Sequence, residues 1–194
     1  MPSKTAAALG RAALIAALAL QTACVSMQAT TYNVGMDSSA ALARHAHGAP
    51  VNVGAFSAEA KLDRRALNVR GSTLNGGADG RFSTYLRDAL QAELRSAGRL
   101  DPAAATEISG ELLDQHLNGG SGSVNGTALI KARFVVSREG KTLYDRTLSQ
   151  EHRWESSLLG PIAIPAAFDN YVTTVQKLLQ QLFADPQFEQ ATSR

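Results

Sequence analysis

Cysteine is nearly absent from this sequence, which has a single one, Cys24, among 194 residues. One cysteine cannot form an internal disulfide, and it cannot supply the cysteine pairs of a structural zinc site. The H-E-x-x-H motif of zinc peptidases and the G-x-S-x-G turn of serine hydrolases are also missing. We therefore expect no metal, no cofactor and no catalytic nucleophile.

The chain also lacks an excess of charge. It has 19 Lys and Arg against 17 Asp and Glu, and two of the basic residues, Lys4 and Arg11, lie in the first 23 residues, which hold no acid. The remainder is therefore close to neutral. Because nucleic-acid binding depends on clustered basic residues that neutralise phosphates, we expect no nucleic-acid partner.

Long apolar runs are missing too, since no stretch approaches the roughly 20 apolar residues that cross a membrane as a helix. The run Ala12–Leu20 has nine apolar residues, with Lys4 and Arg11 before it and three small or polar residues after it. This order is that of a secretory signal peptide. We expect residues 1–23 to be removed on export.

Cys24 follows directly, in the run Leu20-Gln21-Thr22-Ala23-Cys24. This run resembles the bacterial lipobox, in which the cysteine after a small residue is diacylated and becomes the new N-terminus. The resemblance implies a protein held in a membrane by its lipid chains. In lipoproteins of many Gram-negative bacteria, an Asp directly after the cysteine is linked to retention in the inner membrane. Here that position is Val25, so the resemblance implies the periplasmic face of the outer membrane. Gln21 occupies a position that is usually Leu, so ordinary cleavage to an unlipidated product is the alternative.

The rest of the chain divides into a tether, one domain and a short tail. Residues 24–50 are rich in Ser, Thr, Ala and Gly without sustained periodicity, which is typical of a flexible tether. Residues 51–188 are expected to form a single domain, and residues 189–194 a polar tail.

Two segments of the domain have the apolar spacing of amphipathic helices. Apolar residues recur at three and four positions over Phe82–Ala97, and Gly98 stands where a helix stop belongs. The same spacing predicts a second helix over Ala166–Phe183, with Pro165 in its first turn and Pro186 beyond its end.

The strands are predicted from alternating apolar and polar residues. They are Val51–Phe56, Leu67–Arg70, Glu107–Leu117, Thr127–Ser137 and Thr142–Trp154, with Gly110 as a weak point or bulge. Glycine-rich residues 71–80 and 118–126 are expected to be loops, and residues 138–141 a tight turn. This order predicts an α+β two-layer sandwich: a mainly antiparallel sheet of about four strands with both helices on one face.

Basic residues gather on the last two predicted strands, namely Lys131, Arg133, Arg146 and Arg153. An uncovered sheet face or edge that carries them could contact an anionic glycan or a protein partner. The alternative is ordinary charge that keeps the domain soluble.

An apolar run follows the sole tryptophan, Trp154. Residues 158–164 (LLGPIAI) begin with Leu158 and Leu159 and are hard to bury in full. Exposed apolar patches mark interaction sites, so this run and Trp154 are candidates for a partner or lipid contact. The alternative for Trp154 is that it covers the core beneath the second helix.

Acid–base chemistry would have to use Asp114, His116 and His152, which lie on two different predicted strands and could approach one another across the sheet. An envelope hydrolase would bring the three together in one pocket, whereas a solvated sheet face would pair them with polar neighbours. His45 and His47 lie in the expected tether without a third ligand, so we interpret them as solvated rather than metal-binding.

These features together resemble small Gram-negative outer-membrane lipoproteins. The lipobox, the tether, "FSTYLRDALQAELRSAGRL", "EISGELLDQHL", the strand hairpin and "VQKLLQQLFADPQF" have the layout of YajG-type lipoproteins. The lipoprotein LptE and the peptidoglycan-synthase activators have related sheet-and-helix domains. The resemblance concerns layout over residues 51–188, so no site residue is transferred. It implies a non-enzymatic accessory or binding module in envelope assembly or transport. An envelope hydrolase and a subunit of an oligomeric secretion assembly are the alternatives.

Overall fold

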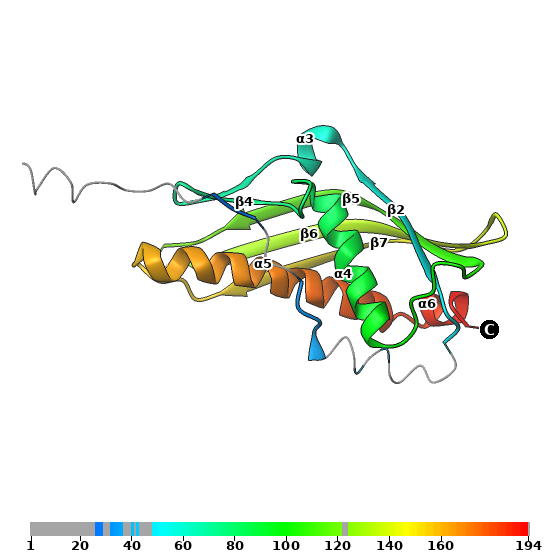
Figure 1. Cartoon of the computed structure of the whole chain (residues 1–194). Coiled ribbons are helices and arrows are strands. Elements are labelled where there is room, and N and C mark those ends of the chain that lie inside the picture. Colours follow the sequence, from blue (N-terminus) through cyan, green and yellow to red (C-terminus); the bar gives the residue numbers. More distant parts are fainter. Residues whose placement is uncertain are drawn as a thin grey trace, which may run out of the picture.

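The computed structural model describes residues 26–28, 32–36, 40, 42, 48–121 and 124–193. The predicted signal peptide, Cys24 and the histidines His45 and His47 lie outside these residues. The chain forms the expected α+β fold (Figure 1). Its elements, in chain order, are β1 (Ser26–Gln28), β2 (Asn52–Ala58), α3 (Ala60–Asp63), β3 (Leu67–Val69), β4 (Ser72–Asn75), α4 (Phe82–Ser96), β5 (Thr106–Asn118), β6 (Gly126–Arg138), β7 (Lys141–Trp154), α5 (Gly160–Phe183) and α6 (Pro186–Ala191).

The main sheet has four strands in the order β2-β5-β6-β7. β5, β6 and β7 form the predicted antiparallel meander, whereas β2 pairs in parallel with β5. Glu139 and Gly140, in the turn between β6 and β7, have φ angles of 51° and 76°. Positive φ at both positions suits the twist of a two-residue hairpin, which explains the glycine there.

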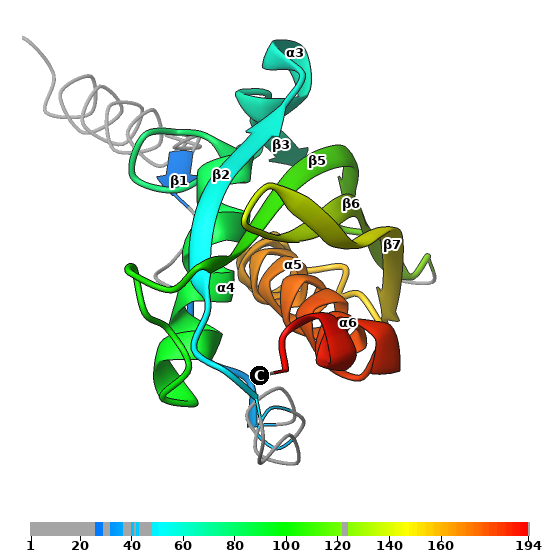
Figure 2. The same ribbon diagram turned by 90° about the vertical axis from the view of Figure 1, so that its right-hand side faces the viewer.

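The core lies between one face of this sheet and the helices α4 and α5 (Figure 2). Five β6 side chains on this face are at most 1% exposed: Ala128, Ile130, Ala132, Phe134 and Val136. α4 packs against β2 and β5, and α5 packs against β6 and β7. Phe82 of α4 and Tyr171 of α5 meet edge to face, with their ring centroids 5.6 Å apart. Both amphipathic helices therefore cover the same face, as predicted.

A one-residue bulge changes the alternation along β5. Leu112 pairs with Ala132 and Asp114 pairs with Lys131, so Leu113 is the extra residue. Because side chains alternate between faces, the inserted residue turns Asp114 outward, although strict alternation from Leu112 would turn it into the core.

Gly110, where the sequence suggested a weak point or bulge, keeps its regular pairing with Phe134. The irregularity beside it lies on β2, between Val53 and Phe56. A Cβ added at Gly110 would lie 2.4 Å from the ring of Phe56, so this glycine allows a close approach of the aromatic ring.

The expectation that residues 71–80 form a loop is wrong for the first half of this segment. Ser72–Asn75 form β4, which pairs with β3 on one side and with β1 on the other to make a second, three-stranded sheet. Ser72 and Leu74 are buried and alternate with half-buried neighbours. This alternation, rather than the glycine content, decides the local structure.

α5 begins six residues earlier than the helix predicted from Ala166. It starts at Gly160, with Pro161 in its first turn and Pro165 inside the helix. In the first turn a backbone N–H has no acceptor within the helix, so Pro161 costs no helical hydrogen bond. Within the described part of the chain, no helix is long and apolar enough to cross a membrane.

The expected tether is, in its described parts, packed onto the domain. β1 belongs to the second sheet, and Tyr32 and Leu42 are only 9% and 2% exposed. The Tyr32 hydroxyl donates a hydrogen bond to Glu93 Oε1, 2.6 Å away, and the backbone N–H of Gly35 donates to the same atom. A buried carboxylate requires such donors, so Glu93 fixes this segment in place.

The prediction of a polar tail over residues 189–194 is also wrong, because residues 186–191 form α6. Phe188, Ala191 and Thr192 are at most 5% exposed. Buried Arg99 donates to the carbonyls of Ala49 and Thr192, which joins both ends of the domain. Polar composition misled the prediction here because Phe188 and Ala191 suffice to hold a short helix on the core.

Candidate functional site

The face of the main sheet that points away from α4 and α5 is polar. We call it the polar sheet face. It is formed by outward-facing residues of the meander: Glu111, Asp114 and His116 of β5, Thr127, Leu129, Lys131 and Arg133 of β6, and Asp145, Glu151 and Arg153 of β7. The helices α4 and α5 pack against the opposite face. The two faces of one sheet are therefore chemically distinct.

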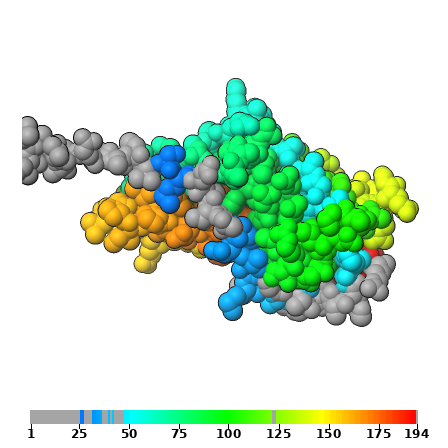
Figure 3. All heavy atoms as spheres, viewed as in Figure 1, coloured from blue at the N-terminus to red at the C-terminus, as the bar shows by residue number. Residues whose placement is uncertain are grey.

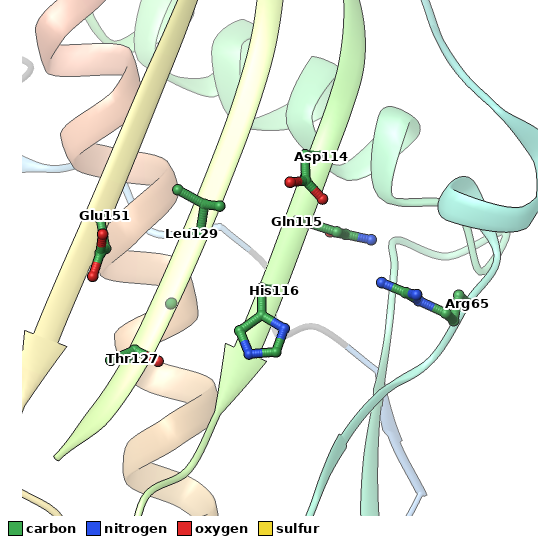
Figure 4. Close-up of a pocket in the computed structure, with 8 residues that line it drawn as sticks. Arg65, Asp114, Gln115, His116, Thr127, Leu129 and Glu151 are labelled. Carbon is green, nitrogen blue, oxygen red and sulfur yellow. The ribbon is translucent and has the colours of Figure 1, made fainter.

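A hollow of about 410 Å³ opens on the polar sheet face (Figure 4). It is lined by Arg65, Asp114, Gln115, His116, Thr127, Ala128, Leu129 and Glu151. Figure 4 shows Arg65 reaching in from beyond the edge of β5, while the other labelled side chains come from the three strands. The hollow thus joins a residue from the connection between α3 and β3 to residues of the meander.

One row across the strands runs through the hollow. His116 pairs with Leu129, and Leu129 pairs with Glu151. Neighbouring strands lie about 4.8 Å apart, so the backbones at His116 and Glu151 are about 10 Å apart, with the Leu129 side chain between them. The row places an apolar floor between a ring nitrogen donor or acceptor and a carboxylate.

Several polar groups of the hollow are not used inside the protein. The side chains of Arg65, Asp114, His116 and Thr127 make no hydrogen bond or ion pair with another described residue. Gln115 differs, because its amide donates to the Leu62 carbonyl and accepts from the Tyr171 hydroxyl. The free groups include donors and acceptors, and their charges nearly balance.

The basic residues predicted as a contact surface are mostly paired. Arg133 makes a bidentate ion pair with Asp145, in which Nε lies 2.7 Å from Oδ1 and Nη2 lies 2.6 Å from Oδ2. Arg153 contacts Glu151 at 2.7 Å. Of the predicted residues on this face, Lys131 alone has no such partner among the described residues. This leaves little free positive charge for an anionic glycan.

The ion pair between Arg133 and Asp145 shifts both pKa values in the direction that favours charge. Its hydrogen bonds raise the pKa of Arg133 and lower that of Asp145. Both side chains are solvent-exposed, so screening by water keeps the contribution to stability small.

Arg146, the fourth predicted contact residue, lies on the other side of the sheet. Its guanidinium contacts Asp185 at 3.1 Å, beside the start of α6. Burial acts to raise the pKa of Asp185, but hydrogen bonds from the Gln187 N–H, the Tyr144 hydroxyl and Arg146 outweigh it and lower the pKa. Arg146 therefore contributes to holding α6 and not to the polar sheet face.

The three residues of the hydrolase alternative do not converge. Asp114 and His116 line the hollow, whereas His152 lies on the opposite face, with Nε2 3.0 Å from Asn170 Oδ1 and Nδ1 2.8 Å from Lys177 Nζ. Burial and then the charge of Lys177 lower the pKa of His152, which favours its neutral form. Lys177 donates to Nδ1, which leaves Nε2–H to donate to Asn170.

Trp154 and the residues after it separate into a packed part and an exposed part. The Trp154 indole packs against the core and against Gly126, where an added Cβ would lie 2.2 Å from it. Leu158, Leu159 and Ile162 are 79%, 62% and 57% exposed. The packed position agrees with the core interpretation of Trp154, and the exposed leucines keep the apolar run as a contact candidate.

The sequence patterns did not single out Arg65, which lines the hollow, or Arg70, which lies in the turn between β3 and β4. Arg65 enters the hollow from a polar connection that has no motif. Arg70 precedes Gly71 between two short alternating segments, and both residues have positive φ, 51° and 81°. A two-residue turn with glycine at its second position was the signal that could have placed Arg70 in a hairpin.

No known family model matches the sequence, and no curated protein matches it. Among solved structures, a Xanthomonas campestris protein of family DUF330 superposes with a TM-score of 0.56 at 14% identity, covering 82% of this chain and 95% of that chain. This likeness shows a shared fold.

Two further structures are less similar. They are a minor lipoprotein from Acinetobacter baumannii (TM-score 0.40, 11% identity, 70% of this chain and 90% of that chain) and a proposed lipoprotein from Caulobacter crescentus (TM-score 0.43, 11% identity, 81% and 99%). At these TM-scores they add nothing to what the first likeness shows.

Proposed function

We propose that this protein is a lipid-anchored, non-enzymatic binding module of the cell envelope. Cys24 carries the acyl chains at the periplasmic face of the outer membrane, and the hollow on the polar sheet face binds a hydroxyl-rich ligand such as an envelope glycan. In this role the protein is an accessory to envelope assembly or transport.

The observation that carries the proposal is the set of free polar groups around an apolar floor. Hydroxyl groups both donate and accept hydrogen bonds, so a ligand rich in them can satisfy the Arg65 donors and the Asp114 acceptors together. The apolar side chain of Leu129 suits the C–H face of a sugar ring. Because the charges nearly balance, we expect a neutral glycan to bind better than an anionic one.

A binding role is favoured over hydrolysis by the arrangement of the titratable groups. His116 and Asp114 make no hydrogen bond to each other, and His152 lies on the opposite face. General acid–base catalysis requires groups within hydrogen-bond reach of one reacting atom. Because the three residues are separated, the hydrolase alternative does not meet this requirement.

Binding is tested by titrating the purified chain with a neutral N-acetylhexosamine tetrasaccharide and with a sulfated oligosaccharide of equal length. We expect saturable heat release with the neutral ligand, and binding at least tenfold weaker in His116→Ala and Asp114→Asn. Asp169→Asn, on the exposed side of α5, is the matched control and retains binding. Equal binding by all variants, or no binding of the neutral ligand, would refute the hollow as the site.

The anchor is tested by intact mass and membrane fractionation after expression in a Gram-negative host, beside Cys24→Ala. We expect a triacylated N-terminal cysteine in the outer-membrane fraction and loss of both the mass increment and the membrane association in the variant. An unmodified mass in the soluble periplasm would refute the anchor and leave the hollow to be judged by the titration.

A further inference from the structure

Three large apolar side chains protrude together where α5 begins. Leu158, Leu159 and Ile162 lie within five residues of one another and are 79%, 62% and 57% exposed. We call them the apolar tip. Figure 3 shows the first turns of α5 (orange) projecting at the left-hand end of the molecule. Neither the core nor the proposed hollow uses these side chains.

The apolar tip is held in place at its base by Arg70. Its guanidinium donates to the carbonyls of Ser157 and Leu158, at 2.7 and 3.1 Å, and twice to the carbonyl of Gly120. The Ser157 hydroxyl accepts from the backbone N–H of Leu159. These bonds fix the main chain just before the helix, so the tip protrudes from an ordered support.

The N-terminal segment enters the fold at the same end. β1 runs parallel to β4 with Ser26 opposite Thr73, so the start of β1 faces the turn at Arg70. Cys24 is outside the described residues, but only two peptide units separate it from Ser26, which limits the distance between their Cα atoms to about 7 Å. In Figure 1 the β3–β4 turn and the start of α5 both lie at the left-hand end.

We propose that the apolar tip inserts into the lipid leaflet that receives the acyl chains of Cys24. The domain is then attached at two points, the lipid chains and the tip. A lipid surface is the occupant because the chain that leads to the anchor begins at this end. Arg70 adds a positive charge that no described carboxylate pairs with, which suits lipid phosphates. This proposal rests on the anchor in the proposed function.

Insertion is tested by placing a tryptophan in the tip of the full-length protein. Leu159→Trp is incorporated into phosphatidylethanolamine–phosphatidylglycerol vesicles with brominated acyl chains, which quench tryptophan fluorescence on contact. The matched control is Leu143→Trp, an exposed leucine on β7 near the turn to β6, at the opposite end of the strands. The unchanged protein gives the signal of Trp154 for subtraction.

We expect the quenching added by Leu159→Trp to exceed that added by Leu143→Trp at least twofold, together with a blue shift of its emission. Equal quenching at the two positions would overturn insertion and would point to a protein partner for the tip.

The anchor and the tip fail separately in this design. If intact mass shows an unmodified Cys24, the anchor fails, and the same variants are attached to the vesicles through a maleimide lipid at the free thiol. The quenching comparison then still decides whether the tip inserts.

Discussion

The two faces of β6 are built from alternate residues of one strand, yet they differ in burial and in chemistry. The inner face is apolar and at most 1% exposed, and it packs against α5. The outer face carries Thr127, Lys131 and Arg133 beside solvent. A change on the inner face should therefore affect folding, and a change on the outer face should affect recognition with little effect on folding.

The largest test of this difference compares two neighbours on β6. Phe134→Ala removes a fully buried ring that meets Phe56 edge to face, so we expect a loss of about 3–5 kcal/mol in the free energy of unfolding. Val135→Ala, on the outer face, should cost less than about 1 kcal/mol. Urea unfolding followed by Trp154 fluorescence measures both, and equal losses would contradict the comparison.

A smaller effect is expected for the two ion pairs, one on each side of the sheet. Asp185 caps α6 through the N–H of Gln187 and also accepts from Tyr144 and Arg146, so Asp185→Ala should cost about 1–2 kcal/mol. Asp145→Ala removes an exposed partner of Arg133 and should leave the melting temperature within replicate scatter. A larger drop in stability for Asp145→Ala than for Asp185→Ala would contradict the expected order of the two ion pairs.

The smallest effect concerns pH. The folded-state pKa of Asp185 is lowered below the unfolded value of about 3.9, so its stabilisation is present above that pH and is lost as pH falls through 3.9 toward the folded pKa. Asp185→Asn should therefore lose less stability than the parent between pH 5 and pH 3 in urea titrations. Asp145→Asn should flatten this dependence less, because solvent screens its pair. Identical pH profiles for all three proteins would contradict this.

The meander and both main helices were predictable because each has a long, consistent period. β6 alternates over its whole length, and the stripe of α4 runs from Phe82 to Leu94. β4 and α6 were missed because each is held by one or two buried side chains, Leu74 in β4 and Phe188 in α6, within a polar or glycine-rich segment. The local pattern of such short elements is too brief to stand out, and their stability depends on tertiary packing.

The candidate site was only partly predictable. Asp114 and His116 were recognised as chemically interesting, but their outward direction depends on the bulge at Leu113, which the sequence does not mark. Arg65 joins them from a connection some 50 residues earlier in the chain. The grouping follows from the topology of the sheet and from the path of the α3–β3 connection.

The length of β6 and β7 determines how far the molecule reaches. Strands of 13 and 14 residues, at about 3.3 Å per residue, extend roughly 45 Å from the Trp154 end to the Glu139–Gly140 turn. Two partners bound at opposite ends would be held apart by this distance, because a paired and packed sheet resists compression. The paired strands of the meander thus keep its two ends at a fixed separation.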